Sequence, residues 1–135
     1  MVPLAMPQHA YPTFSAPVIP GVQRGRKLGV PTFNVRPEDV PPDLRRGIYA
    51  CFAQLDDDVD HHPAVMHYGP RPVFNDTESC EVHVIGQVVD RQPSRLSVAI
   101  VEFIRGVEDY PLPEVLQEQM QSDIAVARAI LGIPP

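Results

Sequence analysis

The stretch LSVAIVEFI, residues 96–104, decides the fold that the sequence predicts. Apolar side chains occupy every second position from Leu96 to Ile100, which is the period of a strand with one buried face. The apolar positions then change parity at Val101 and Phe103, and this change indicates a β-bulge near Ile100. Because a bulge bends its strand and increases the twist, the run predicts a sheet that curls.

Five further runs have the length and composition of strands, and each is bounded by proline, glycine or aspartate. They span residues 14–19, 30–35, 47–55, 64–68 and 80–89. The 17 prolines lie largely between the runs, as expected for loops and strand edges. Since parallel strands would need crossover connections, this order of elements predicts antiparallel pairing and a mainly β, barrel-like domain.

A single helix is predicted after the last strand. Its apolar residues recur at intervals of three or four and form one stripe that should pack on the sheet, namely Leu116, Met120, Ile124, Ala127 and Leu131. Pro113 suits the first turn, Arg128 suits the last turn, and Gly132 followed by Pro134 is a natural stop.

Composition predicts one small domain over residues 1–135, with an irregular segment at residues 1–13. The formal net charge of -6 argues against a nucleic-acid partner, which usually requires a basic surface. Cys51 and Cys80 fall within predicted strands and are expected to be buried and unpaired. The proline-broken N-terminus and the lack of a long apolar run predict a cytoplasmic protein that does not contact a membrane. A monomer is expected.

The stretch GVQRGRKLGVPTFN, residues 21–34, carries the predicted chemistry. Its glycines let backbone N–H groups approach an anion, and they are Gly21, Gly25 and Gly29. Its cations supply compensating charge, and they are Arg24, Arg26 and Lys27. We therefore expect a phosphate-binding loop, although an ordinary basic turn before a strand is about equally compatible with the spacing.

A metal site is predicted at the end of the same stretch. Pro31 favours an extended backbone before it, so Thr32 and Asn34 should project from the same side of a strand. A hydroxyl and an amide oxygen suit Mg²⁺, which takes few protein ligands and lets nucleotide phosphates complete its shell.

A candidate base lies in CEVHVIG, residues 80–86. Val82 and Val84 should face one side of this strand, which leaves Glu81 and His83 on the other. From the pattern alone Glu81 is better explained as a solvated strand residue, since glutamate is mostly exposed. His61, His62 and His67 follow an acidic run and are expected to lie in a solvated hairpin loop.

The sequence RGRKLGVPTFN resembles the signature of riboflavin kinases, the domain that also forms the C-terminal half of bacterial FAD synthetases. Further similar motifs follow in the same order along the chain: GIYA at residues 47–50, GPRPVF at 69–74, CEVHVIG at 80–86, FIR at 103–105 and LQEQMQSDIAVAR at 116–128. The resemblance covers residues 14–131. It implies a closed, Greek-key-like barrel of six antiparallel strands with a C-terminal helix packed on it.

The resemblance also implies an activity, the transfer of the ATP γ-phosphate to the ribityl 5′-hydroxyl of riboflavin with Mg²⁺ present. Glu81 would be the catalytic base, and Thr32 and Asn34 would hold the metal. The nucleotide would be bound by Gly21, Arg24, Gly25, Arg26, Lys27, Gly29, Pro31 and Thr32. The flavin would be lined by Arg105, Tyr110 and Leu116. Phe33 replaces a small residue of the family motif and is expected to alter the nucleotide pocket.

Other functions fit the same sequence. The chain lacks the His-x-Gly-His motif of the nucleotidylyltransferase domain, so the product expected is FMN and not FAD. His83 is a second candidate for the base. A non-catalytic barrel that only binds flavin or nucleotide, and an interaction barrel with no ligand, remain open at this stage.

Overall fold

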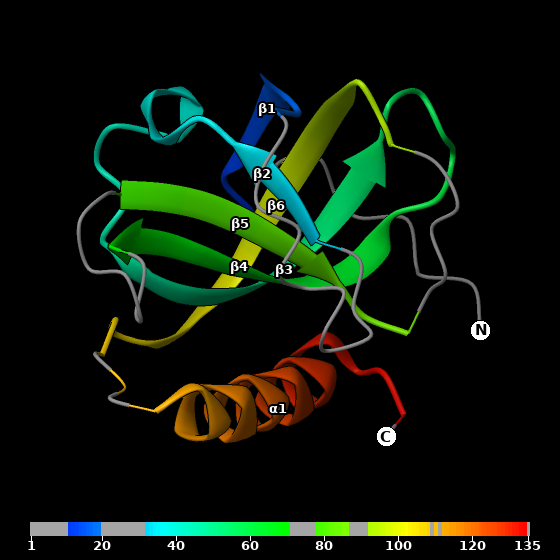
Figure 1. Ribbon diagram of the computed structural model, residues 1–135. Helices are drawn as coiled ribbons and strands as arrows, with labels where there is room; N and C mark the ends of the chain where they lie inside the picture. Colours follow the sequence, from blue (N-terminus) through cyan, green and yellow to red (C-terminus); the bar gives the residue numbers. More distant parts are fainter. Residues whose placement is uncertain are drawn as a thin grey trace.

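The computed structural model describes residues 11–19, 32–70, 78–86, 92–108, 110 and 112–134. Within them a curled six-stranded sheet lies above one C-terminal helix (Figure 1). The strands are β1 (Thr13–Pro17), β2 (Thr32–Val35), β3 (Gly47–Leu55), β4 (His62–Pro70), β5 (Glu78–Val84) and β6 (Arg95–Arg105), and the helix is α1 (Pro113–Leu131). The mainly β class, the antiparallel pairing and the single terminal helix are confirmed.

The sheet has the strand order β1-β6-β3-β4-β5-β2, and every neighbouring pair is antiparallel. The pairing of β3 with β6 shifts register twice, between Ile48 and Tyr49 and between Ala50 and Cys51. At the second shift the partners of Ala50 and Cys51 are Glu102 and Ile100, so β6 has an extra residue there. The predicted bulge near Ile100 is confirmed, and it bends the longest strand of the sheet.

The closed barrel is not confirmed, because the two edge strands, β1 and β2, do not pair along their length. Among the described residues a single bridge joins the two edges, where the Ile19 N–H donates to the Asn34 carbonyl over 2.9 Å. Both edge strands are short, and Pro17 at the end of β1 has no N–H to donate. The sheet is therefore an open half-barrel.

The inner face of the sheet holds the main hydrophobic core, which includes Met66, Val82, Leu96 and Val98. Phe33 also points into this core and is only 6% exposed. Its bulk fills the interior and lies on the face of β2 opposite Thr32 and Asn34. Phe33 therefore does not share the face of Thr32 and Asn34. The predicted nucleotide-binding residues from Gly21 to Pro31 lie outside the described residues, so the expected effect of Phe33 on the nucleotide pocket stays a prediction.

The two cysteines, Cys51 and Cys80, lie in the same core as free, fully buried thiols, as predicted. Burial raises the pKa of Cys80 to about 12 and raises that of Cys51 further. Both side chains are therefore small hydrophobic groups and not nucleophiles.

The helix α1 packs on the outer face of the sheet and forms a second core there (Figure 1). This core joins Ile48, Ala50 and Val65 of the sheet to Ala127 of the helix. The helix begins at Pro113 and ends before Gly132, whose φ of 71° gives the left-handed cap expected of glycine. No helix in the described part of the chain is long and apolar enough to cross a membrane.

Candidate functional site

Strand pairing brings four of the predicted site residues to the outer face of the sheet: Thr32, Asn34, Glu81 and Arg105. Five directly paired residues form a row across β2, β5, β4, β3 and β6: Asn34, Glu81, His67, Ile48 and Arg105. A parallel row begins with Thr32 and His83, which pair on β2 and β5. Residues that are up to 71 positions apart in the chain thus share one surface, because antiparallel register places alternate side chains on the same face.

Thr32 and His83 form a hydrogen bond of 2.8 Å between the threonine hydroxyl and the imidazole Nδ1. His83 is buried, and desolvation lowers its pKa from 6.5 to about 4 although the charge of Asp123 opposes the shift. The ring is therefore neutral at physiological pH. With the proton on Nε2, Nδ1 accepts from the Thr32 hydroxyl and orients its oxygen as an acceptor.

Burial of His83 should make folding stability depend on pH. Its folded pKa of about 4 lies below the ordinary value of 6.5, so the unfolded chain binds the proton first as pH falls. The contribution is complete above pH 6.5 and is lost toward pH 4, by as much as about 3 kcal/mol. Urea unfolding at pH 7 and pH 5 measures this loss. His83→Gln should flatten the dependence, leaving the smaller contribution of His67, and an unchanged slope would contradict the assignment.

Glu81 lies between Asn34 on β2 and His67 on β4, directly paired with both. Its side chain is half-buried, so its carboxylate is accessible to a ligand on the outer face of the sheet. Glu81 and His83 lie on the opposite face from Val82 and Val84, as the alternation predicted. A carboxylate, an amide and a hydroxyl therefore share one face of two neighbouring strands.

The prediction that His67 lies in a solvated hairpin loop is wrong. β4 begins at His62, and His67 is a strand residue that is only 7% exposed. Desolvation lowers the His67 pKa, and the charge of Glu81 partly opposes the shift. The missed signal is period-two alternation, because Val65 and His67 share the parity opposite to that of the core residue Met66.

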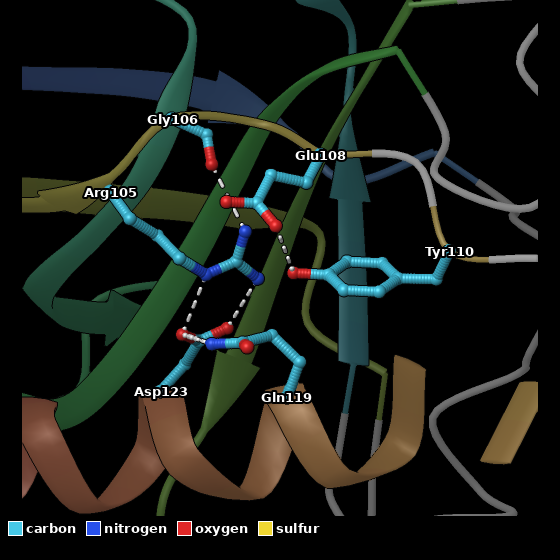
Figure 2. A network of polar contacts seen from close by, with 6 residues as sticks. All are labelled: Arg105, Gly106, Glu108, Tyr110, Gln119 and Asp123. Atoms are coloured by element: carbon cyan, nitrogen blue, oxygen red, sulfur yellow. Dashed lines mark hydrogen bonds and ion pairs between the residues drawn. The ribbon is translucent and has the colours of Figure 1, made fainter. Parts of the chain in front are cut away.

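Arg105 ends the row at β6 and is held by the helix (Figure 2). Its guanidinium binds the Asp123 carboxylate in a bidentate manner, Nε to Oδ1 over 2.9 Å and Nη2 to Oδ2 over 2.8 Å. A third contact runs from Nη1 to the Gly106 carbonyl over 3.0 Å, and Gln119 donates to Asp123 over 3.0 Å. Asp123 interrupts the apolar stripe of α1, and the periodicity of that stripe did not identify it.

Two of the three predicted flavin residues lie together. The Arg105 guanidinium carbon is 5.7 Å from the centre of the Tyr110 ring, and the Tyr110 hydroxyl donates to Glu108 over 3.4 Å (Figure 2). Leu116 is half-buried on α1, two turns before Asp123. The predicted nucleotide residues from Gly21 to Pro31 lie outside the described residues, so of the predicted phosphate and metal site only Thr32 and Asn34 are placed.

The side chains on the outer face that could bind a metal are the oxygen groups of Thr32, Asn34 and Glu81. The neutral imidazoles of His67 and His83 lie beside them. Among the described residues, no group of three or more histidine, cysteine, aspartate or glutamate side chains could hold a metal ion. A neutral hydroxyl and an amide beside one carboxylate fit Mg²⁺ that is shared with phosphate oxygens, whereas they suit zinc poorly.

Comparison with known proteins points to one family. The family model described as riboflavin kinase matches residues 8–131. The riboflavin kinase of Aspergillus niger is 32% identical over 158 residues, covering 95% of this chain and 74% of its own length. The riboflavin kinase of Homo sapiens is 35% identical over 124 residues, covering 87% and 79%.

A solved structure shares the fold. The riboflavin kinase of Trypanosoma brucei superposes with a TM-score of 0.58 at 18% identity, covering 90% of this chain and 80% of that one. Together with the match over residues 8–131, the similarity to the fungal and human enzymes shows that the chain belongs to the riboflavin kinase family.

Proposed function

We propose that the chain transfers the γ-phosphate of ATP to the ribityl 5′-hydroxyl of riboflavin, and that Glu81 accepts the proton of that hydroxyl. Its family makes the chain an enzyme that converts riboflavin to FMN, with ATP as the phosphate donor. The observation that supports the residue assignment is the direct pairing of Glu81 with Asn34, next to the hydrogen-bonded pair of Thr32 and His83.

The chemistry of phosphoryl transfer needs few groups. Its loose transition state requires positioning, neutralisation of charge on the phosphoryl oxygens, and a carboxylate that orients or accepts the proton of the nucleophile. Glu81 supplies the carboxylate from a strand whose backbone is paired on both sides, which keeps the group in place. A half-buried carboxylate can reach a substrate hydroxyl and still exchange protons with solvent.

Thr32 and Asn34 are the proposed protein ligands of Mg²⁺. Both side chains lie on the outer face of the sheet, as Glu81 of the neighbouring strand does. The Thr32 oxygen is oriented by its bond to His83. When bound, the ion would neutralise phosphate charge and align the nucleotide. The basic, glycine-rich residues from Gly21 to Pro31 directly precede β2 and are the proposed phosphate-binding segment.

Arg105, Tyr110 and Leu116 are the proposed flavin residues. Support comes from the position of Arg105 in the same row as Glu81, with the aromatic ring of Tyr110 beside it. An arginine and an aromatic ring provide flat surfaces on which a ring system can stack.

The direct test of the function is incubation of the protein with riboflavin, ATP and Mg²⁺, followed by chromatography. We expect a new FMN peak that depends on all three components. A folded protein that binds both substrates but forms no FMN would be a non-catalytic flavin-binding barrel, and that result would reject the proposal.

Removing the Thr32 hydroxyl should weaken nucleotide binding only when the metal is present. We expect Thr32→Ala to lower the affinity for MgATP by about tenfold, because a metal ligand and its orientation are lost. Titration calorimetry with and without Mg²⁺ measures the effect. Thr32→Ser keeps the hydroxyl and is the matched control. Equal loss of MgATP and metal-free riboflavin binding in the alanine variant would indicate misfolding and not metal ligation.

A further inference from the structure

Two polar side chains on the outer face of the sheet are buried without a hydrogen-bond partner among the described residues. They are His67, through both ring nitrogens, and Ser79, through its hydroxyl. His67 is 7% exposed and Ser79 is 5% exposed, so bulk water does not solvate either group well. Buried polar groups in folded proteins are nearly always hydrogen-bonded, so two unsatisfied groups near one another require an explanation.

His67 and Ser79 lie on two paired strands, and both are close to Glu81 in the register. His67 of β4 pairs directly with Glu81 of β5, and Ser79 pairs with Gly69 on the same two strands. The intervening residues Tyr68 and Cys80 pack on the inner core, so the other four share the outer face. His67 and Ser79 are therefore diagonal neighbours, a spacing that one small flexible molecule can span.

Gly69 is the third outer-face residue beside His67 and Ser79, and there is little room around it. A side-chain carbon at Gly69 would lie 2.9 Å from a methyl group of Val107 and 3.4 Å from the Arg46 Cβ, so both neighbours approach the strand closely. The φ of 144° at Gly69 is also one that other residues rarely adopt. Val107 and Arg46 thus crowd the sheet at Gly69, the residue paired with Ser79.

The unsatisfied groups are suited to neutral hydroxyls. Burial keeps the His67 imidazole uncharged, so one ring nitrogen donates and the other accepts. The Ser79 hydroxyl can also do both. A hydroxyl group donates and accepts in the same way, whereas an anion would accept only and would meet the carboxylate of Glu81. Because His67 is directly paired with Glu81, a hydroxyl bound by its ring would lie next to the proposed base.

We propose that His67 and Ser79 bind hydroxyl groups of the substrate's polyol chain and so position the chain for proton transfer to Glu81. The inference rests on the proposed function, because it assumes that the riboflavin polyol chain lies against Glu81. His67 contributes the larger part, since it is directly paired with the base and has two unsatisfied atoms. Its role is to select and hold the polyol, and Glu81 remains the base.

The test compares two flavins that differ only in the polyol chain. Riboflavin and lumiflavin share the ring system, and lumiflavin carries a methyl group in place of the ribityl chain. We expect His67→Leu to weaken riboflavin binding by about tenfold, the equivalent of about one lost hydrogen bond, and to leave lumiflavin binding unchanged. Quenching of flavin fluorescence in the absence of ATP measures both dissociation constants.

Two further variants sharpen the test. His67→Gln keeps a donor and an acceptor and should recover part of the riboflavin affinity. Ser79→Ala should give a smaller loss that is again confined to riboflavin. Since leucine removes two unsatisfied atoms, the thermal midpoint of the free His67→Leu protein should be equal to or above that of the wild type. A lower midpoint with equal loss of both flavins would show a structural role and overturn the proposal.

Other outcomes separate this inference from the proposed function. Unchanged riboflavin affinity with a lower kcat in His67→Leu would mean that His67 orients Glu81 and does not bind the polyol, which overturns the inference alone. A wild-type protein that binds riboflavin but forms no FMN would reject the proposed function, while the comparison of the two flavins would still decide the role of His67. A wild-type protein that binds neither flavin would reject both.

Discussion

Glu81→Gln should lower the rate of FMN formation by about 10² to 10⁴, the usual contribution of a general base. Glutamine keeps the side-chain volume and one acceptor oxygen but cannot take the proton of the attacking hydroxyl. The rate is measured at saturating riboflavin and MgATP, so that a change in affinity does not mimic a change in chemistry. The thermal midpoint of the variant should stay close to that of the wild type, because Glu81 is only half-buried.

A matched control for this change is Glu102→Gln. Glu102 is an exposed strand residue on β6 and lies outside the proposed machinery, so its loss should leave the rate unchanged. A wild-type rate in Glu81→Gln would remove Glu81 from the mechanism and leave His83 as the next candidate. Its ring is neutral at physiological pH and able to accept a proton, because burial lowers the pKa of His83 to about 4.

Asp123→Asn should destabilise the fold by about 3 kcal/mol, since it leaves a mostly buried arginine without its counter-charge. Only 5% of the Asp123 side chain and 19% of the Arg105 side chain are exposed. Burial alone would lower the Arg105 pKa, but the hydrogen bonds and charge of Asp123 outweigh it and raise that pKa. Urea denaturation gives the free energy of unfolding of the variant and the wild type.

The ion pair also links α1 to Arg105, which ends the row of paired residues that contains Glu81. The variant should therefore bind riboflavin less well even where it remains folded. Glu118→Gln is the matched control, because Glu118 is an exposed residue of the same helix. Its loss should change stability by no more than about 0.5 kcal/mol. If Asp123→Asn were as stable as this control, the pair would not hold α1 on the sheet.

Local sequence patterns predicted the strands and the helix well. The spacing of apolar side chains and the residues that begin or end an element are both found within a few residues of one another. β3 has the bounds predicted for residues 47–55, and the bulge near Ile100 was visible as a change of parity. The helix begins at Pro113 and ends before Gly132, the two residues that marked its ends in the sequence. The closed barrel was not predicted correctly, because closure depends on how two edge strands meet and not on the strands themselves.

The candidate site was predicted in part. Alternation alone placed Thr32 with Asn34 and Glu81 with His83, since neighbours two apart in a strand share a face. It did not reveal Asp123, which breaks the apolar stripe of α1 and is bound there by Arg105 and Gln119. Alternation also marks His67 as a strand residue, but it did not reveal that His67 is buried, because its neighbours Glu81, His83 and Arg105 come from other strands.

The amino-acid sequence by itself determined the strand and helix segments, the two faces of each strand and the family. These features depend on side-chain period and on short motifs, both of which are local. Only the tertiary structure decided that Asn34, Glu81, His67 and Arg105 form one row, and that Asp123 and His67 are buried. The physical reason is register: hydrogen bonds between strands that are distant in the chain choose which residues meet, and no local pattern contains that choice.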